Sequence, residues 1–88
     1  MLKISRSDRG SIHTTLQLEG RVTQADLSIL ERTHEECQKQ GRRLALDLVG
    51  VSFVDREGVA ALNRMRRNGT IITGCSPFVG ELLKESSR

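Results

Sequence analysis

Three carboxylates near the middle of the chain, Asp47, Asp55 and Glu57, are the first side chains whose chemistry suggests a reaction. Paired-acid catalysis needs one acid with a raised pKa in a pocket, beside a basic or nucleophilic companion. Asp47 lies in an apolar run, Asp55 precedes a helical pattern, and no such companion is near them in the sequence. We therefore expect no catalytic residues and a protein that is not an enzyme.

The histidines and cysteines do not form a metal site either. His13 and His34 lack metal-ligand spacing with each other or with Cys37 and Cys75. Outside CxxC or Cys/His patterns, two distant cysteines are typical of reduced, partly buried residues. The glycines form neither a GxGxxG motif nor a phosphate-binding loop. The sequence therefore predicts no metal and no cofactor.

The first half of the chain reads as a hairpin followed by a helix. Residues 2–5 and 12–19 alternate apolar and polar side chains around turn residues 7–11, which predicts two antiparallel strands. Thr23 is placed to cap a helix that ends before Gly41. Four positions at helical spacing should form its buried stripe: Leu27, Leu30, His34 and Cys37.

The second half alternates strand and helix. The nearly continuous apolar run 44–49 predicts a central parallel strand buried on both faces. Asp55 can cap a helix that ends near Arg67, with apolar positions on one side of it. Residues 70–73 form a short β-branched strand, and Ser-Pro at 76–77 starts a last helix.

The order of elements, β-β-α-β-α-β-α, predicts an α/β fold in one domain spanning residues 1–88. Its sheet should be mixed and mostly parallel, with about four strands and about three helices. The polar end, residues 85–88, should fray. No apolar run approaches the roughly 20 residues of a membrane span. The N-terminus has no secretory signal pattern, so we expect a cytoplasmic protein.

The chain is mildly basic, with a net charge of +3 and arginines clustered at 42–43 and 64–67. Proteins that bind single-stranded nucleic acid interleave such charge with stacking aromatics. This chain has no Trp or Tyr, and Phe53 and Phe78 lie in apolar contexts typical of a core. We therefore expect a solvated or partner-facing basic surface and no nucleic-acid binding.

Two segments carry a resemblance to a known family. Residues 46–59, LDLVGVSFVDREGV, resemble the stretch between the third strand and second helix of STAS domains, and residues 18–22, LEGRV, resemble the end of the family's second strand. The resemblance is to the anti-sigma-factor antagonist type. It implies a STAS-like fold and a non-catalytic regulatory module that binds a serine-kinase anti-sigma factor.

In that family the kinase phosphorylates a serine just before the glycine that corresponds to Gly58, and Glu57 stands there instead. The resemblance therefore implies that the usual phosphorylation switch is missing. Glu57 either imitates part of a phosphorylated state or simply stabilises the first turn of the helix through its dipole. We prefer the second interpretation. Among alternative hydroxyls, we expect Ser52 to be buried or loop-forming and Thr23 to act as a cap.

The resemblance and the strand-end position together predict a partner-binding surface at 52–62 and the nearby Thr23-Gln24 loop. Its predicted residues are Thr23, Gln24, Val54, Asp55, Arg56, Glu57, Gly58 and Val59. The partner would be an anti-sigma-factor kinase. The alternative is a transport ATPase, because small STAS proteins without the serine also serve in membrane lipid-transport complexes. The sequence leaves a homodimer open.

Overall fold

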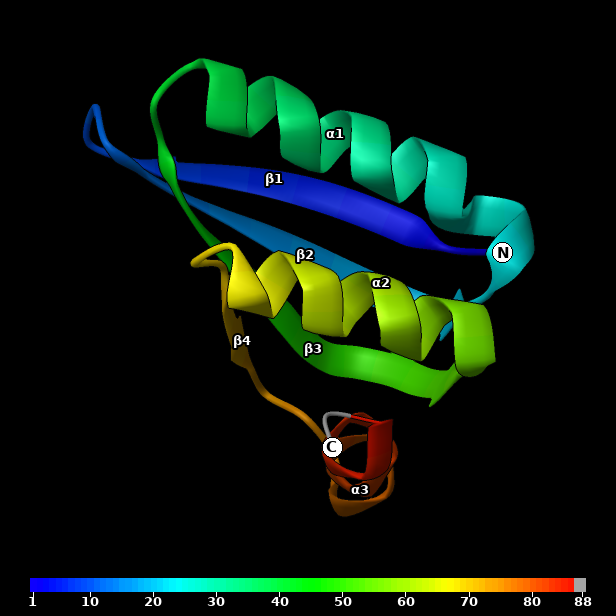
Figure 1. Ribbon diagram of the computed structural model, residues 1–88. Helices are drawn as coiled ribbons and strands as arrows, with labels where there is room; N and C mark the ends of the chain where they lie inside the picture. Colours follow the sequence, from blue (N-terminus) through cyan, green and yellow to red (C-terminus); the bar gives the residue numbers. More distant parts are fainter. Residues whose placement is uncertain (87–88) are drawn as a thin grey trace.

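The computed structural model describes residues 1–86 and has the predicted order of elements (Figure 1). The elements are β1 (Lys3–Arg9), β2 (His13–Val22), the short 3₁₀ helix η1 (Gln24–Asp26), α1 (Leu27–Lys39), β3 (Arg43–Val54), α2 (Arg56–Arg67), β4 (Ile71–Thr73) and α3 (Pro77–Ser86). Together they confirm the predicted mixed α/β fold.

The four strands form one sheet in the order β1-β2-β3-β4. β1 pairs antiparallel with β2, and the other two pairs are parallel. The α1 and α2 crossovers each move the chain one strand in the same direction. Right-handed crossovers therefore place both helices on the same face of the sheet, while α3 packs against α2 and β3 (Figure 1).

This one-sided covering decides which side chains of β3 are buried. Leu44, Leu46 and Leu48 are buried under the helices, whereas Ala45 is half-buried and Val49 is 76% exposed on the other face. The prediction of a strand buried on both faces was therefore wrong, because no helix within residues 1–86 covers the second face. β3 is also longer than the predicted 44–49, since it continues without a loop to Val54.

The core lies between the sheet and the two crossover helices. The predicted stripe of α1 is confirmed, with three of its positions buried and Leu27 packed at the margin. The inward positions of α2 are buried as well. The buried positions on the two helices are Leu30, His34 and Cys37 in α1 and Gly58, Val59, Ala61, Leu62, Asn63 and Met65 in α2.

The boundaries at the hairpin and at the end of the chain also differ from the expectations. β1 continues to Arg9, so the hairpin turn is confined to residues 10–12, and the left-handed backbone at Gly10 (φ 61°) makes the reversal. At the other end, α3 reaches Ser86. The rest of the predicted fraying falls on residues 87–88, which lie outside the described residues.

The last helix begins as predicted, because the Ser76 hydroxyl accepts a hydrogen bond from the Val79 amide (3.1 Å). Its first turn does not bury Phe78, which is 55% exposed and stacks on half-buried Phe53 with 6.5 Å between ring centroids. The expectation that both rings belong to the core was wrong. They meet where α3 docks on β3, and the Arg21 guanidinium lies 5.2 Å from the Phe53 centroid.

Candidate functional site

The candidate site forms where β2 and β3 end and the two crossover helices begin. Because the strands are parallel, their carboxyl ends meet at one edge of the sheet. α1 and α2 consequently start at the same end of the molecule (Figure 1). This arrangement brings the Thr23-Gln24 loop beside the Asp55–Val59 segment.

Asp55 joins the two helix starts. One carboxylate oxygen accepts a hydrogen bond from the Gly58 amide (2.7 Å), which confirms the predicted cap of α2. The other oxygen accepts from the Gln24 amide (2.9 Å), at the first turn that leads into α1. The Asp55 amide donates to the Val22 carbonyl (3.0 Å). A single side chain therefore fixes the positions of both segments.

The predicted cap at Thr23 differs in detail. Thr23 occupies the N-cap position of η1, but its side chain makes no cap hydrogen bond. Its hydroxyl instead donates to the Asp26 carboxylate over 3.4 Å. The Asp55 carboxylate instead accepts from a different amide of this turn, that of Gln24, which it reaches from the neighbouring strand end.

Three of the predicted site residues lie beneath the surface. Val54 and Val59 are buried in the core, and Gly58 is buried at the contact between α2 and the end of β2. A Cβ atom at Gly58 would lie 2.6 Å from the Val22 carbonyl oxygen and 2.8 Å from Val54 Cγ1. These residues shape the site from below, and α2 can approach β2 this closely only with glycine at position 58.

The exposed part of the predicted set consists of Gln24, Arg56 and Glu57. Glu57 is in the first turn of α2, where the helix dipole favours a negative charge. Ser52 was expected to be buried or in a loop, but it lies exposed on β3 and its hydroxyl donates to the Gly20 carbonyl over 3.3 Å. Ser52 lies between buried Val51 and Val54, at an irregularity in the β2–β3 register where it has no partner residue on β2.

Sequence reasoning missed several exposed neighbours of this set. Arg21 lines a shallow hollow of about 470 Å³ with Thr23 and Asp26. Ile29 is exposed on the outer side of α1. Their signals were present, since Ile29 lies outside the buried helical stripe and Arg21 lies just beyond residues 12–19, where the second strand was expected to end. They enlarge the exposed surface around Gln24.

The other candidate groups do not join this site. His34 is buried, with its Nε2 2.6 Å from the Thr70 hydroxyl, and burial lowers its pKa. Cys37 and Cys75 are free thiols, and burial raises the pKa of Cys75. Among residues 1–86, no group of three or more His, Cys, Asp or Glu side chains could hold a metal ion.

The arginines that cluster in the sequence at 42–43 and 64–67 do not form continuous basic patches on the surface. In α2, Arg64 pairs with Glu31 of α1 at 3.3 Å, and Arg66 donates to Asn63 at 2.6 Å. The neighbours Arg42 and Arg43 are split between the two faces of the sheet, since Arg42 turns into the hairpin and Arg43 is exposed. Within the described part of the chain, no helix is long and apolar enough to cross a membrane.

Comparison with known proteins identifies the fold. Neither a family model nor a curated protein matches the sequence. Among solved structures, the chain is similar to the anti-sigma factor antagonist SpoIIAA in its unphosphorylated form. The match has a TM-score of 0.71 and 19% sequence identity, and it covers 93% of this chain and 82% of that chain. The STAS-like fold predicted from residues 46–59 and the order of elements is therefore confirmed.

Proposed function

We propose that this protein is a non-catalytic regulatory module that binds another protein through the surface formed by Gln24, Arg56 and Glu57. The partner that fits best is a serine-kinase anti-sigma factor, because the fold is that of an anti-sigma factor antagonist. On this proposal the protein works in the cytoplasm, where sigma factors act.

The observation that carries the proposal is the exposed Glu57 on a helix start that Asp55 holds in place. The same carboxylate fixes the adjoining loop through the Gln24 amide. A surface that is already ordered loses little conformational entropy when a partner binds. Arg56 beside Glu57 offers both signs of charge, which favours a specific orientation of the partner.

Glu57 also defines the kind of regulation. Its position corresponds to that of the serine that is phosphorylated in the family the sequence resembles, and its side chain has no hydroxyl that a serine kinase could phosphorylate. One permanent charge replaces the roughly −1.5 to −2 charges of a phosphoserine. We propose that binding here is not switched by phosphorylation at position 57, and that the amount of protein sets how much partner is bound.

The test is affinity capture from lysate of the source organism with three baits: wild type, Glu57→Arg and Glu36→Arg. Glu36 is also exposed, but it lies in the second half of α1, outside the proposed surface. Because both variants replace Glu with Arg, they change the net charge of the protein equally. We expect wild type and Glu36→Arg to capture a kinase of the anti-sigma type and Glu57→Arg to lose it, since rim charges control the encounter between partners. The same kinase should phosphorylate Glu57→Ser but not wild type.

The other outcomes separate the alternatives. Capture of a transport ATPase by the same two baits would assign the protein to a lipid-transport complex while keeping the surface. If all three baits capture the same proteins, the surface at Glu57 is not the docking site and the proposal fails. If wild type captures no partner that Glu57→Arg lacks, the proposal fails equally.

A further inference from the structure

The uncovered face of the sheet carries a row of three basic side chains at the end opposite to the partner-binding surface. Arg9 on β1 pairs in register with His13 on β2, and His13 pairs in register with Arg43 on β3. All three side chains are exposed on the face without helices. Because neighbouring strands lie about 4.8 Å apart, the row spans only about 10 Å.

The row borders a hollow with a partly apolar floor. A depression of about 310 Å³ is lined by all three basic residues together with Thr15, Ala45 and Ile71. Ile71 is 62% exposed, which is high for a large apolar side chain. The volume is at the lower end of the range of small-molecule sites. The hollow thus offers cationic donors on one side and a hydroxyl and apolar carbon on the other.

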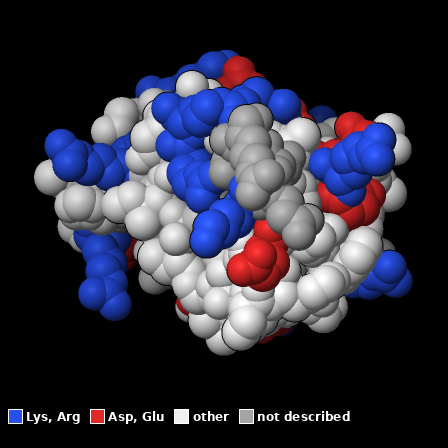
Figure 2. All heavy atoms as spheres, turned by 60° about the horizontal axis from the view of Figure 1, so that its bottom comes forward, with Lys and Arg blue, Asp and Glu red and all other residues white. Residues whose placement is uncertain are grey.

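No carboxylate among the described residues forms an ion pair with this row. Within residues 1–86, neither Arg9 nor Arg43 has an ion pair. The first carboxylate along β3 on this face is Asp47, four residues beyond Arg43 and about 13 Å away at the rise of a strand. Seen from the side of α3, the surface shows more Lys and Arg atoms than Asp and Glu atoms (Figure 2).

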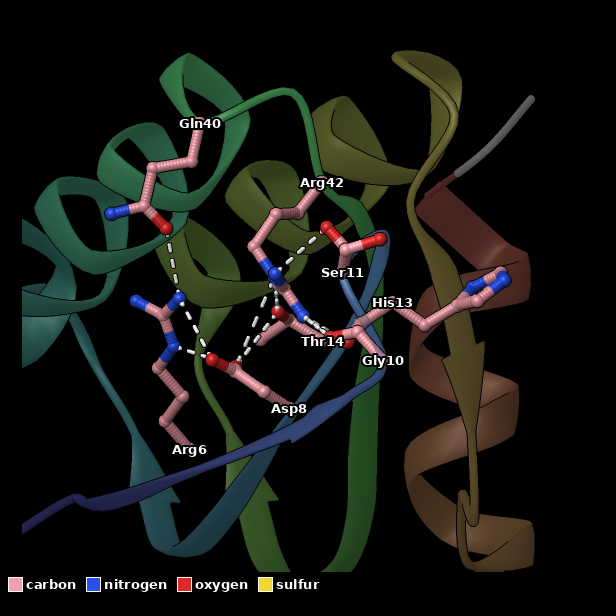
Figure 3. A network of polar contacts seen from close by, with 8 residues as sticks. All are labelled: Arg6, Asp8, Gly10, Ser11, His13, Thr14, Gln40 and Arg42. Atoms are coloured by element: carbon pink, nitrogen blue, oxygen red, sulfur yellow. Dashed lines mark hydrogen bonds and ion pairs between the residues drawn. The ribbon is translucent and has the colours of Figure 1, made fainter.

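A network on the opposite side of the hairpin holds the row in position (Figure 3). Arg42 donates to the carbonyls of Gly10 (3.0 Å), Ser11 (2.9 Å) and His13 (2.7 Å), and also to the Thr14 hydroxyl. Its side chain is only 11% exposed. The hairpin tip between Arg9 and His13 is therefore tied to the residue that precedes Arg43.

The acid of this network faces away from the row. Asp8 accepts hydrogen bonds from Arg6 (2.8 Å) and from the Thr14 hydroxyl (2.9 Å), and these bonds lower its pKa. Because side chains alternate along a strand, Asp8 points to the helix-covered face and Arg9 to the open one. In Figure 3 the His13 ring likewise points away from the network. The one carboxylate of this network thus serves Arg6 and Arg42, and among the described residues the three basic side chains on the open face have no carboxylate partner.

We propose that Arg9, His13 and Arg43 bind the phosphate group of a small phosphomonoester, whose organic part lies on Ile71 and Ala45. Guanidinium groups donate to phosphate oxygens in a bidentate manner, and a phosphomonoester has enough acceptor oxygens to meet donors from three neighbouring strands. The apolar floor favours an ester over inorganic phosphate. This site is independent of the partner-binding surface, from which it is separated by the length of the sheet.

The test is an NMR titration of the whole protein at constant ionic strength with inorganic phosphate and with phenyl phosphate. We expect phenyl phosphate to bind more tightly and to shift the amide signals of residues 13, 15, 45 and 71. Arg9→Gln and Arg43→Gln should each weaken binding about tenfold, the loss expected for a hydrogen bond to a charged group. Arg32→Gln, an exposed arginine on α1, is the matched control and should leave affinity unchanged.

A second experiment, with lipid vesicles, distinguishes a soluble phosphomonoester from a lipid headgroup as the ligand. Sedimentation with phosphatidic acid vesicles, but not phosphatidylcholine vesicles, together with its loss in Arg9→Gln would support the same phosphate chemistry with a lipid as its source. Equal weakening by Arg9→Gln and Arg32→Gln would show general charge attraction and overturn the proposal. Absence of binding to phenyl phosphate and to both vesicles would also overturn it. Thermal melts of each variant establish that it is folded.

Discussion

The two oxygens of the Asp55 carboxylate accept hydrogen bonds from the starts of two different helices. Removing this side chain should therefore destabilise the protein more than the loss of an ordinary helix cap. Asp55→Ala removes the acceptors of the Gly58 and Gln24 amides together. A lost cap costs about 1 kcal/mol, and the second hydrogen bond adds a similar amount. We expect the free energy of unfolding in urea to fall by about 2 kcal/mol.

Asp26→Ala is the matched control for this change. The Asp26 carboxylate is also beside the Thr23 loop, but it accepts only the long bond from the Thr23 hydroxyl. Its replacement should alter the free energy of unfolding by less than about 0.5 kcal/mol, as for other sites that lack a specific structural role. Equal losses in the two variants would contradict the bridging role of Asp55.

His34 should make the stability of the protein depend on pH. Burial lowers its pKa in the folded protein below the value of about 6.5 expected in the unfolded chain. The unfolded chain therefore binds the proton first as pH falls, and the free energy of unfolding decreases from about pH 6.5 down to the folded pKa. Glu31 and Glu35, on the same helix, line the surface hollow at His34, and Arg64 lines it from α2.

Urea denaturation at pH 7.5, 6.5 and 5.5 measures this dependence. The free energy of unfolding should change less with pH in His34→Gln than in wild type, because glutamine cannot take up the proton. This comparison holds whatever the absolute stability of the variant. His13→Gln, in which an exposed ring is replaced, is the control. Identical slopes for wild type and His34→Gln would show that His34 does not cause the pH dependence.

At the scale of the elements, glycine has opposite roles in α2 and α3. A methyl group at Gly58 would press on the Val22 carbonyl at 2.6 Å, whereas at Gly80 its nearest neighbour would be Cys75 Cβ at 3.9 Å. Gly58→Ala should therefore destabilise the protein by about 1–3 kcal/mol through overpacking. Gly80→Ala should stabilise it by up to about 1 kcal/mol, because alanine favours the helix. Thermal or urea denaturation of the two variants tests both signs.

The order of the elements could be predicted because each has a clear period or cap. The side of β3 that is buried could not. An apolar run such as 44–49 is compatible with one buried face or two, and the choice depends on where the crossover helices pack. The one indication in the sequence was Asp47, a charged residue within the apolar run, which is half-buried on the face of β3 that the helices do not cover. Its carboxylate accepts a hydrogen bond from the Val49 amide (3.0 Å), close to an irregularity in the β2–β3 register.

The candidate site was predictable only in part for a similar reason. Asp55 stood out as a cap from its neighbours in the sequence, which is a local signal. Its bond to Gln24 joins residues that are 31 positions apart, and its geometry depends on the register between two parallel strands. Phe53 and Phe78 were assigned to the core from their apolar neighbours, but one-sided covering of the sheet leaves their contact near the surface.

For the whole molecule, the layered arrangement predicts a gradient of stability across the sheet. Leu46 lies in a central strand under two helices, while its partner Ile72 lies in a three-residue edge strand. We expect the amide of Leu46 to exchange with solvent far more slowly than that of Ile72, because edge segments open locally before the core unfolds. Hydrogen exchange followed by NMR measures both rates. Equal rates would mean that β4 opens only with the whole protein.

The stacked pair of Phe53 and Phe78 also gives the molecule a built-in reporter. The chain has no Trp or Tyr, and these are its only two phenylalanines. Since one ring belongs to β3 and the other to α3, a nuclear Overhauser effect between them arises only while the last helix is docked. The aromatic region of a two-dimensional proton NOESY spectrum can therefore follow α3 during ligand or partner titrations, without a label or a mutation.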